Sequence, residues 1–242
     1  MNNHEFPYHI FSLGDTAITV DFGNCIDEAI NKEVIAIFNH LQQLPLPGMI
    51  EAVPAYSSLT VYYDVMALKK KTASNQTVFE WMKQQLEERL QQPVLQNEMT
   101  KRLVKIPVCY DEKFAMDILH LAKTNNISVD EVIQIHTSKP YKVYMLGFLP
   151  GFAYMGEVDE RITMHRKPQP VNIEEGSVGI AGKQTGIYPL DSPGGWQIIG
   201  RTPLKIFDER KEESTLLRAG DMVQFYSITK NEFELINKKS TE

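Results

Sequence analysis

Three glycine-rich stretches in the second half of the chain combine residue types that can hold and position a small polar molecule. They are residues 147–154, 176–189 and 192–203, and ten of the 14 glycines of the chain lie between Gly147 and Gly200. Glycine loses more backbone entropy on folding than any other residue. This density therefore indicates places where the backbone needs a positive φ or where another group approaches it closely.

Side chains that are typical of ligand recognition alternate with these glycines. They are Lys183, Gln184, Thr185, Tyr188, Trp196 and Arg201. A pocket framed by backbone groups, with a few convergent polar side chains, is a common way to bind a small polar ligand. The alternative is that each glycine only forms a tight turn of a β-structure. Turns alone do not need lysine, glutamine, threonine and arginine beside them, so the whole set favours a binding site.

Familiar catalytic motifs are not matched. Five residues separate Gly176 from Gly182, and Gln184 follows Lys183, whereas a P-loop needs four residues and then Ser or Thr after the lysine. Ser177 lacks the Gly-x-Ser-x-Gly context of a hydrolase nucleophile. The six histidines are scattered without a paired spacing, so we predict no metal site.

Charged residues beside the glycine-rich stretches leave two interpretations open. His165, Arg166 and Lys167 can contact an anionic ligand or form a solvated basic loop. Glu174, Glu175 and Asp191 can serve as acids or bases, or can be ordinary surface charges.

Composition excludes several function classes. The net charge of -6 and the lack of a clustered basic patch argue against nucleic-acid binding. No run of about 18 apolar residues predicts a membrane span, and no signal peptide is visible. Two cysteines are too few for a disulfide framework, so we expect a cytoplasmic protein.

The first part of the chain is predicted to be an α/β unit. Ile18, Val20 and Phe22 alternate with polar residues, which is typical of a half-buried strand. A helix capped by Asp27 follows. Its predicted apolar face consists of Ile30, Val34, Ile37, Phe38, Leu41 and Leu44.

The remaining elements of this part suggest a known arrangement. We predict a hairpin of strands near residues 49–55 and 59–63, a helix over 77–90 and a strand over 101–110. The order strand, helix, strand, strand, helix, strand is that of a split βαβ, ferredoxin-like domain. The polar segment near residues 93–100 places the domain boundary, so we predict domains 1–95 and 96–242.

The second domain is predicted to begin with two short helices and to continue as a barrel or sandwich of short strands. Phe114, Ile118, Leu121 and Ala122 mark the first helix, and a capping box that starts at Ser128 opens the second. Many short strands between Gly and Pro turns are typical of an all-β barrel or sandwich. The predicted strands are 143–146, 178–181, 196–199, 204–207 and 222–226.

Together and in this order, the three glycine-rich stretches resemble one family. The chain resembles the family of KipI and the B component of 5-oxoprolinase (PxpB), whose members have an allophanate hydrolase subunit 1-like carboxyltransferase domain. The resemblance rests on residues 147–152, 176–189 and 192–203, and extends to residues 14–17, 53–56, 106–108 and 110–111. One departure is residues 168–170, Pro-Gln-Pro, which lack the second arginine that family members often carry before the glycine run.

The resemblance implies an α+β fold with an N-terminal ferredoxin-like α/β domain and a C-terminal cyclophilin-like β-barrel. It implies one component of an ATP-dependent 5-oxoprolinase, which works with a homologous C component and a separate A component to convert 5-oxo-L-proline to L-glutamate. ATP is bound by the complex. Lys183 and Arg201 are the candidate catalytic donors to developing negative charge. The candidate substrate-binding residues are Gly147, Phe148, Pro150, Gly151, Phe152, Arg166, Gly182, Gln184, Thr185, Tyr188, Gly194, Gly195 and Trp196.

Two alternatives remain open at this stage. In the first, the chain is a KipI-type inhibitor of a sensor histidine kinase, which it binds through an exposed apolar surface of Phe148, Phe152, Tyr154 and Met155. In the second, it is the carboxyltransferase half of a biotin-dependent enzyme similar to urea carboxylase, with biotin on a separate carrier.

Overall fold

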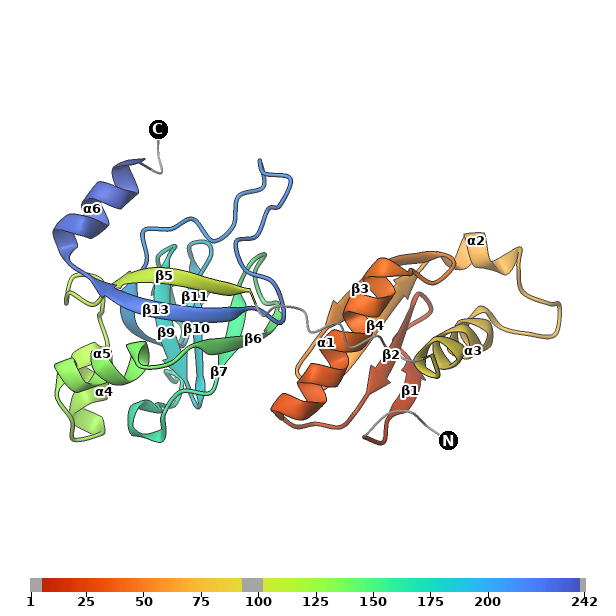
Figure 1. Cartoon of the computed structure of the whole chain (residues 1–242), viewed down its shortest axis with the longest axis horizontal. Coiled ribbons are helices and arrows are strands. Elements are labelled where there is room, and N and C mark those ends of the chain that lie inside the picture. The colour runs from red at the N-terminus through yellow and green to blue at the C-terminus, as the bar shows by residue number, and fades with distance from the viewer. Residues whose placement is uncertain (1–5, 93–101, 240–242) are drawn as a thin grey trace. The chain divides into compact units, whose positions relative to one another are not determined.

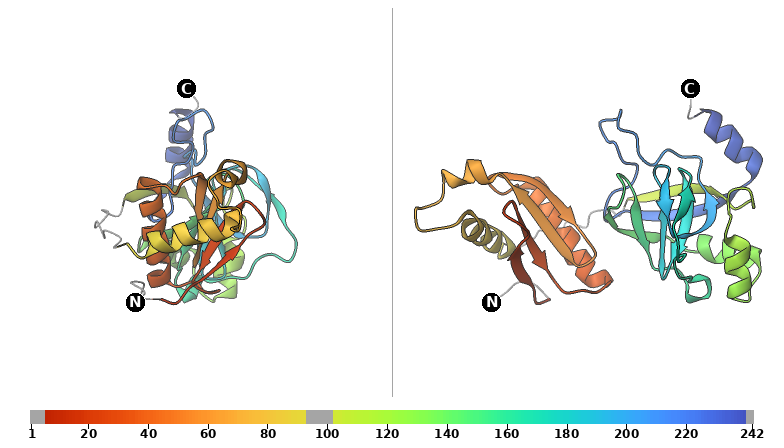
Figure 2. Two further views of the ribbon diagram at one scale, coloured as in Figure 1. Left: turned by 90° about the vertical axis from the view of Figure 1, so that its right-hand side faces the viewer. Right: turned by 180° about the vertical axis from the view of Figure 1, so that it is seen from behind.

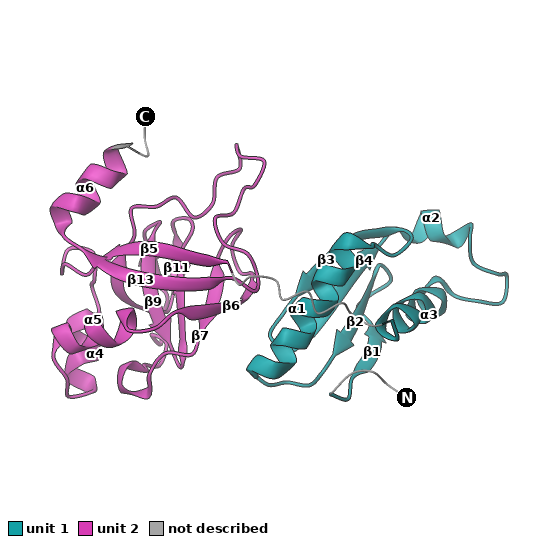
Figure 3. Cartoon of the chain, viewed as in Figure 1, with its two compact units in different colours: residues 1–99 teal, residues 100–242 magenta. Residues whose placement is uncertain are grey.

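The computed structural model describes residues 6–92 and 102–239 of the chain. The chain divides into two compact units, residues 1–99 and 100–242 (Figure 3). The predicted boundary between residues 95 and 96 lies outside the described residues. No helix within the described ranges has both the length and the apolar character needed to cross a bilayer.

Unit 1 is a four-stranded antiparallel sheet with helices packed on it (Figures 1 and 2). Its strands are β1 (His9–Ser12), β2 (Ala17–Asp21), β3 (Met49–Pro54) and β4 (Ser58–Tyr63), in the order β1-β2-β4-β3. Its helices are α1 (Glu28–Gln43), α2 (Val65–Lys69) and α3 (Val78–Leu90). The predicted hairpin of β3 and β4 is confirmed.

Local sequence signals explain where the helices of unit 1 start and which face they bury. The Asp27 carboxylate accepts hydrogen bonds from the first amides of α1, and Thr77 and Glu80 form a capping box at α3. The predicted apolar face of α1 packs on the sheet through Val34, Ile37 and Leu41. Leu44, which we placed on this face, is 54% exposed because it lies beyond the last helical turn.

One predicted sheet assignment in this unit is wrong. The strand at Leu103–Cys109, β5, forms but belongs to the barrel of unit 2 and pairs with its last strand. The fourth strand of the first sheet is instead β1, which forms an antiparallel pair with β2. The split βαβ core of β2, α1 and β3 is present, with β4 inserted between the two strands. The ferredoxin-like classification of the whole unit stays a prediction.

Unit 2 is built on a closed seven-stranded barrel, which fits the cyclophilin-like barrel expected from the family resemblance. The strands follow each other around it in the order β10-β7-β6-β13-β5-β12-β9 (Figure 1). Besides β5, these are β6 (Tyr141–Leu146), β7 (Ala153–Gly156), β9 (Ser177–Ala181), β10 (Gln184–Ile187), β12 (Gln197–Arg201) and β13 (Met222–Ile228). The remaining elements are α4 (Ile118–Thr124), α5 (Val129–Thr137), a 3-10 turn (Glu160–Ile162), β8 (Val171–Ile173), β11 (Ser192–Gly194) and α6 (Lys230–Lys239).

Most of the predicted elements of unit 2 are confirmed. Ser128 and Glu131 form the capping box that opens α5. The strand predicted over residues 204–207 does not form, because the pairing in this segment is a single bridge between Phe207 and Thr215. Instead, β8 and β11 form a separate two-stranded sheet that the sequence did not reveal.

Candidate functional site

Residues from all three glycine-rich stretches meet on the outer face of strands β7, β9 and β10. Val178 and Ile180 of β9 point into the barrel core, whereas Ala181 belongs to a second apolar cluster. We call the four rings of this second cluster, Phe152, Tyr154, Tyr188 and Trp196, the aromatic platform. The Phe152 ring lies edge-on to the other three, with centroid distances of 4.9 Å to Tyr154, 5.1 Å to Tyr188 and 5.3 Å to Trp196.

Glycines make the aromatic platform possible by keeping side chains off the strands beneath it. A Cβ at Gly186 would lie 3.0 Å from the Trp196 ring and 3.1 Å from the Phe152 ring. A Cβ at Gly179 would lie 3.0 Å from the Trp196 Cβ, and one at Gly194 would overlap the Tyr188 ring. These glycines do have close neighbours, as predicted, but the neighbours are the rings of the protein itself.

Arg166 lies over the aromatic platform. Its guanidinium carbon is 5.9 Å from the centroid of the Trp196 ring, within the range of a cation–π contact. Burial raises the pKa of the Tyr154 and Tyr188 hydroxyls, and the nearby positive charge of Arg166 opposes this shift in both. Arg166 is therefore close to three members of the platform.

The loop between β6 and β7 brings the predicted residues Gly147, Phe148, Pro150 and Gly151 to the edge of the platform. The Leu149 amide donates to the Gly147 carbonyl over 2.9 Å, and Phe148 between them has φ of 70°. This is a γ-turn of the rare, strained kind. The Phe148 ring is 62% exposed and lies edge-on to Phe152 at 5.6 Å.

The two candidate catalytic residues are not brought together. Arg201 pairs with Ser177 at the start of β9, and Lys183 lies in the turn after its end. The intervening strand is about 13 Å long at about 3.3 Å per residue. Lys183 forms an exposed ion pair with Glu160 at 3.1 Å. The Arg201 Nε donates to the Glu175 carbonyl over 2.7 Å, and its guanidinium pairs with Glu174.

Three further predicted residues lie away from the platform. Gly182 forms the exposed turn with Lys183, and the half-buried Gln184 follows this turn. Thr185 is fully buried and points into the barrel, where its hydroxyl donates to the Gly179 carbonyl over 3.1 Å. Strand alternation explains the difference, because Thr185 and the outward-facing Gly186 are adjacent in β10.

Thr185 belongs to a buried polar network that the sequence analysis missed. His136 Nε2 lies 3.0 Å from the Thr185 hydroxyl, and His136 Nδ1 lies 2.7 Å from the Tyr110 hydroxyl. Because Thr185 gives its one proton to Gly179, the network assigns the proton of the neutral imidazole to Nε2. Burial lowers the pKa of His136 to about 3 and raises that of Tyr110, so both groups are neutral at pH 7.

Other features of the described residues define what this surface lacks. Within residues 6–92 and 102–239, no three His, Cys, Asp or Glu side chains group as metal ligands would. A surface depression beside β13 is lined by Lys105, Thr137 and residues 224–227, none of which was a predicted site residue. The platform with Arg166 is therefore the place where the predicted binding residues converge.

Comparisons with known proteins identify the kind of chain that carries this platform. The family model described as carboxyltransferase domain, subdomain C and D, matches residues 8–217. The B component of the 5-oxoprolinase of Bacillus subtilis (strain 168) is 45% identical over 235 residues, which are 96% of this chain and 98% of that protein.

Solved structures agree with this match. The crystal structure of TTHA0988 is 34% identical with a TM-score of 0.73, and the match covers 88% of this chain but only 40% of that longer chain. The urea amidolyase of K. lactis, at 21% identity and a TM-score of 0.70, shares the fold over 96% of this chain and 15% of its own. The chain belongs to the family of carboxyltransferase domains, subdomains C and D. Within it, the chain is one of the proteins that form the B component of 5-oxoprolinase.

Proposed function

We propose that this chain is the B component of an ATP-dependent 5-oxoprolinase complex that converts 5-oxo-L-proline to L-glutamate in the cytoplasm. The observation that carries the proposal is the similarity to the Bacillus subtilis protein, which spans 96% of this chain and 98% of that protein. Similarity over nearly the full length of both chains supports the same place in the same kind of assembly. The other members of the complex are a homologous C component and a separate A component.

The geometry supports a binding role for this chain, with a catalytic centre that its partners complete. Opening the resonance-stabilised lactam requires activation of its carbonyl, and ATP supplies this by phosphorylating the oxygen. Lys183 and Arg201 lie at opposite ends of β9 and cannot both reach one reacting oxygen within this chain. Lys183 lies in a hairpin turn, not at a helix N-terminus, so it does not form a P-loop. We therefore assign ATP binding to the complex and substrate contacts to the platform.

The experiment is reconstitution from the purified A, B and C components, with L-glutamate and ADP measured after addition of 5-oxo-L-proline and ATP. We expect no glutamate from this chain alone, ATP-dependent glutamate from the full mixture, and none when this chain is left out. A correctly folded full mixture that forms no glutamate would refute the proposal. The same mixtures supplied with urea, bicarbonate and a biotin carrier test the carboxyltransferase alternative.

The kinase-inhibitor alternative has less support from the structure. Of the four residues that we expected on an exposed apolar surface, Phe152 and Met155 are buried at 1% and 0% exposure. Phe148 is exposed and Tyr154 is half-buried. Binding of a sensor histidine kinase by this chain, with loss of kinase autophosphorylation, would be the result that favours the alternative.

A further inference from the structure

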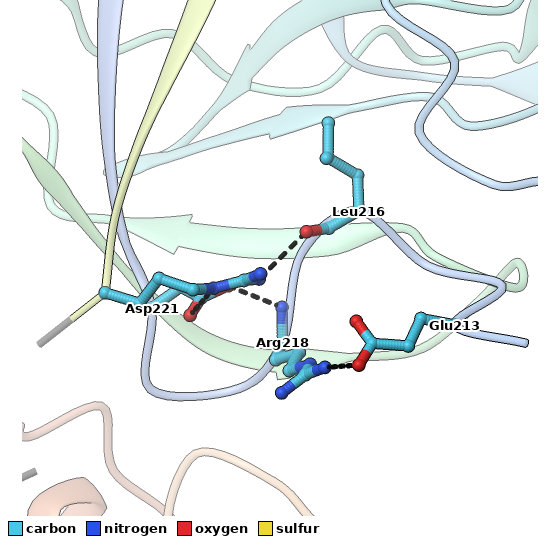
Figure 4. A network of polar contacts seen from close by, with 5 residues as sticks. Glu213, Leu216, Arg218 and Asp221 are labelled. Carbon is cyan, nitrogen blue, oxygen red and sulfur yellow. Dashed lines mark hydrogen bonds and ion pairs between the residues drawn. The ribbon is translucent and has the colours of Figure 1, made fainter.

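Arg166 differs from its neighbours in having no counter-ion. Five of the six arginines in residues 102–239 form an ion pair with a carboxylate. The pairs are Arg102–Asp221, Arg161–Asp159, Arg201–Glu174, Arg210–Asp208 and Arg218–Glu213, of which the last is drawn in Figure 4. Arg166 forms no ion pair with any carboxylate of the described residues, and its recorded contact is with the Trp196 ring.

The residues on either side of Arg166 are fixed to the barrel. The His165 carbonyl accepts from Gln197 Nε2 over 2.9 Å, and the Lys167 amide donates to the Gly195 carbonyl over 2.7 Å. The Lys167 ammonium pairs with Asp117, and both side chains are largely buried at 16% and 14% exposure. The backbone that carries Arg166 is thus held before any ligand arrives, which lowers the entropy cost of binding.

From these contacts we infer that Arg166 binds the carboxylate of the substrate, a small cyclic amino-acid derivative whose ring lies against the platform. A guanidinium presents two parallel N–H donors that match a carboxylate. The half-buried Tyr154 ring and the exposed Phe148 ring supply apolar contact for the ligand ring. This inference rests on the proposed function and deepens it, because 5-oxo-L-proline is such a molecule.

The charge of the surroundings favours a carboxylate over a phosphate. The positive charge of Lys167 is already neutralised by Asp117, and that of Arg201 by Glu174. One uncompensated guanidinium matches a ligand of charge -1, whereas a phosphate or nucleotide calls for several cationic or amide donors. ATP is therefore not the expected ligand of this surface.

The first test is steady-state kinetics of the reconstituted complex with Arg166→Gln, Arg166→Lys and the control Arg161→Gln. Arg161 is also an exposed arginine, and its loss removes only a surface ion pair with Asp159. We expect Arg166→Gln to raise the KM for 5-oxo-L-proline about 10- to 100-fold, the range for a hydrogen bond to a charged group. The KM for ATP and the thermal midpoint should stay within error, and Arg166→Lys should fall between.

The second test asks whether the carboxylate itself is recognised. Binding of 5-oxo-L-proline and of its carboxamide, 5-oxo-L-prolinamide, is measured by NMR titration of this chain and of the complex. Wild-type protein should prefer the acid by about tenfold or more, and Arg166→Gln should bind the two compounds equally. An unchanged preference, or a KM shift of less than twofold in Arg166→Gln, would overturn the inference.

The two tests separate this inference from the proposed function. If the full mixture forms no glutamate but 5-oxo-L-proline still binds in an Arg166-dependent way, the proposed function fails and the carboxylate site remains. If glutamate forms with an unchanged KM in Arg166→Gln, the site assignment fails alone. If 5-oxo-L-proline binds neither this chain nor the complex, the inference is refuted as well.

Discussion

The two faces of strands β7, β9 and β10 are built on opposite plans. The inner face fills the barrel with side chains of the strands themselves, such as Val178, Ile180 and Ile187. The outer face has glycines at Gly179 and Gly186, and rings from other segments lie directly on the backbone. One face is a closed core, and the other is a support on which Arg166 is presented to solvent.

The difference shows what the glycine-rich stretches contribute. A strand that carries only side chains on both faces would hold the rings of Phe152 and Trp196 further from the sheet. Omitting the side chain on one face lets β-strand backbone serve as a flat base for aromatic residues. The stretches thus position a binding surface, and most of their glycines need not touch the ligand.

The largest expected effect comes from removing the centre of the platform. Trp196→Ala leaves a cavity next to Phe152 and Tyr154 and should destabilise unit 2 by about 3–5 kcal/mol. It also removes the ring under Arg166 and should raise the KM for 5-oxo-L-proline. Denaturant unfolding and steady-state kinetics check both effects, with Trp196→Phe as the conservative control. A stable Trp196→Ala variant with unchanged KM would contradict the division between the two faces.

Acid should distinguish the inner face from the outer. The folded state holds His136 neutral with a pKa of about 3, whereas the unfolded chain binds a proton near pH 6.5. The stability from this group is therefore present above pH 6.5 and is lost as the pH falls toward 3. The loss should reach roughly 3 kcal/mol by pH 4.

Hydrogen exchange of the β9 and β10 amides across this pH range measures that loss, because these strands lie over the network. His136→Gln is the matched variant, since glutamine does not titrate. Its exchange rates should depend less on pH than those of the wild type. Parallel pH curves for the two proteins would show that His136 does not set the acid sensitivity of the barrel.

The sequence predicts local features of this molecule better than long-range ones. Helix starts at Asp27, Thr77 and Ser128 depend on residues within one turn, so they can be recognised directly. The place of β5 depends on pairing with β13, more than 100 residues later, and no local pattern reports it. The unpaired segment 204–207 has strand-like residues but no neighbour to pair with beyond one bridge.

The site was predictable in its membership and less so in its orientation. Phe152, Tyr188, Trp196 and Arg166 do meet, as their shared glycine-rich context suggested. Thr185 was assigned to the binding surface but faces the core, because a shift of one residue exchanges the two faces of a strand. Glycine-rich strands lack the apolar alternation that would have fixed this register.

Crowding at Gly186 gives a more local test of the outer face. Gly186→Ala places a Cβ 3.0 Å from both the Ala153 carbonyl and the Trp196 ring, so it should cost about 1–3 kcal/mol by overpacking. Gly182→Ala is the matched control, because its Cβ would meet nothing within 4 Å and only φ of 58° is strained. It should cost about 1 kcal/mol. Thermal unfolding measures both, and equal costs would mean that ring packing does not require glycine at position 186.

The smallest expected change in stability is at Phe148, at the edge of the platform. Phe148→Gly removes an edge-on contact with Phe152 worth about 0.5–1.5 kcal/mol, and relieves a left-handed backbone strain of about 1–2 kcal/mol. The two terms nearly cancel, so the thermal midpoint should hardly move. Phe148→Ala loses the ring but keeps the strain, and should be less stable than Phe148→Gly by about 1 kcal/mol. Both variants should raise the KM for 5-oxo-L-proline equally, because the exposed ring contributes to binding while the strain does not. If both variants kept the wild-type KM, the ligand would not extend to Phe148, and the binding surface would be confined to Arg166 and the rings beneath it.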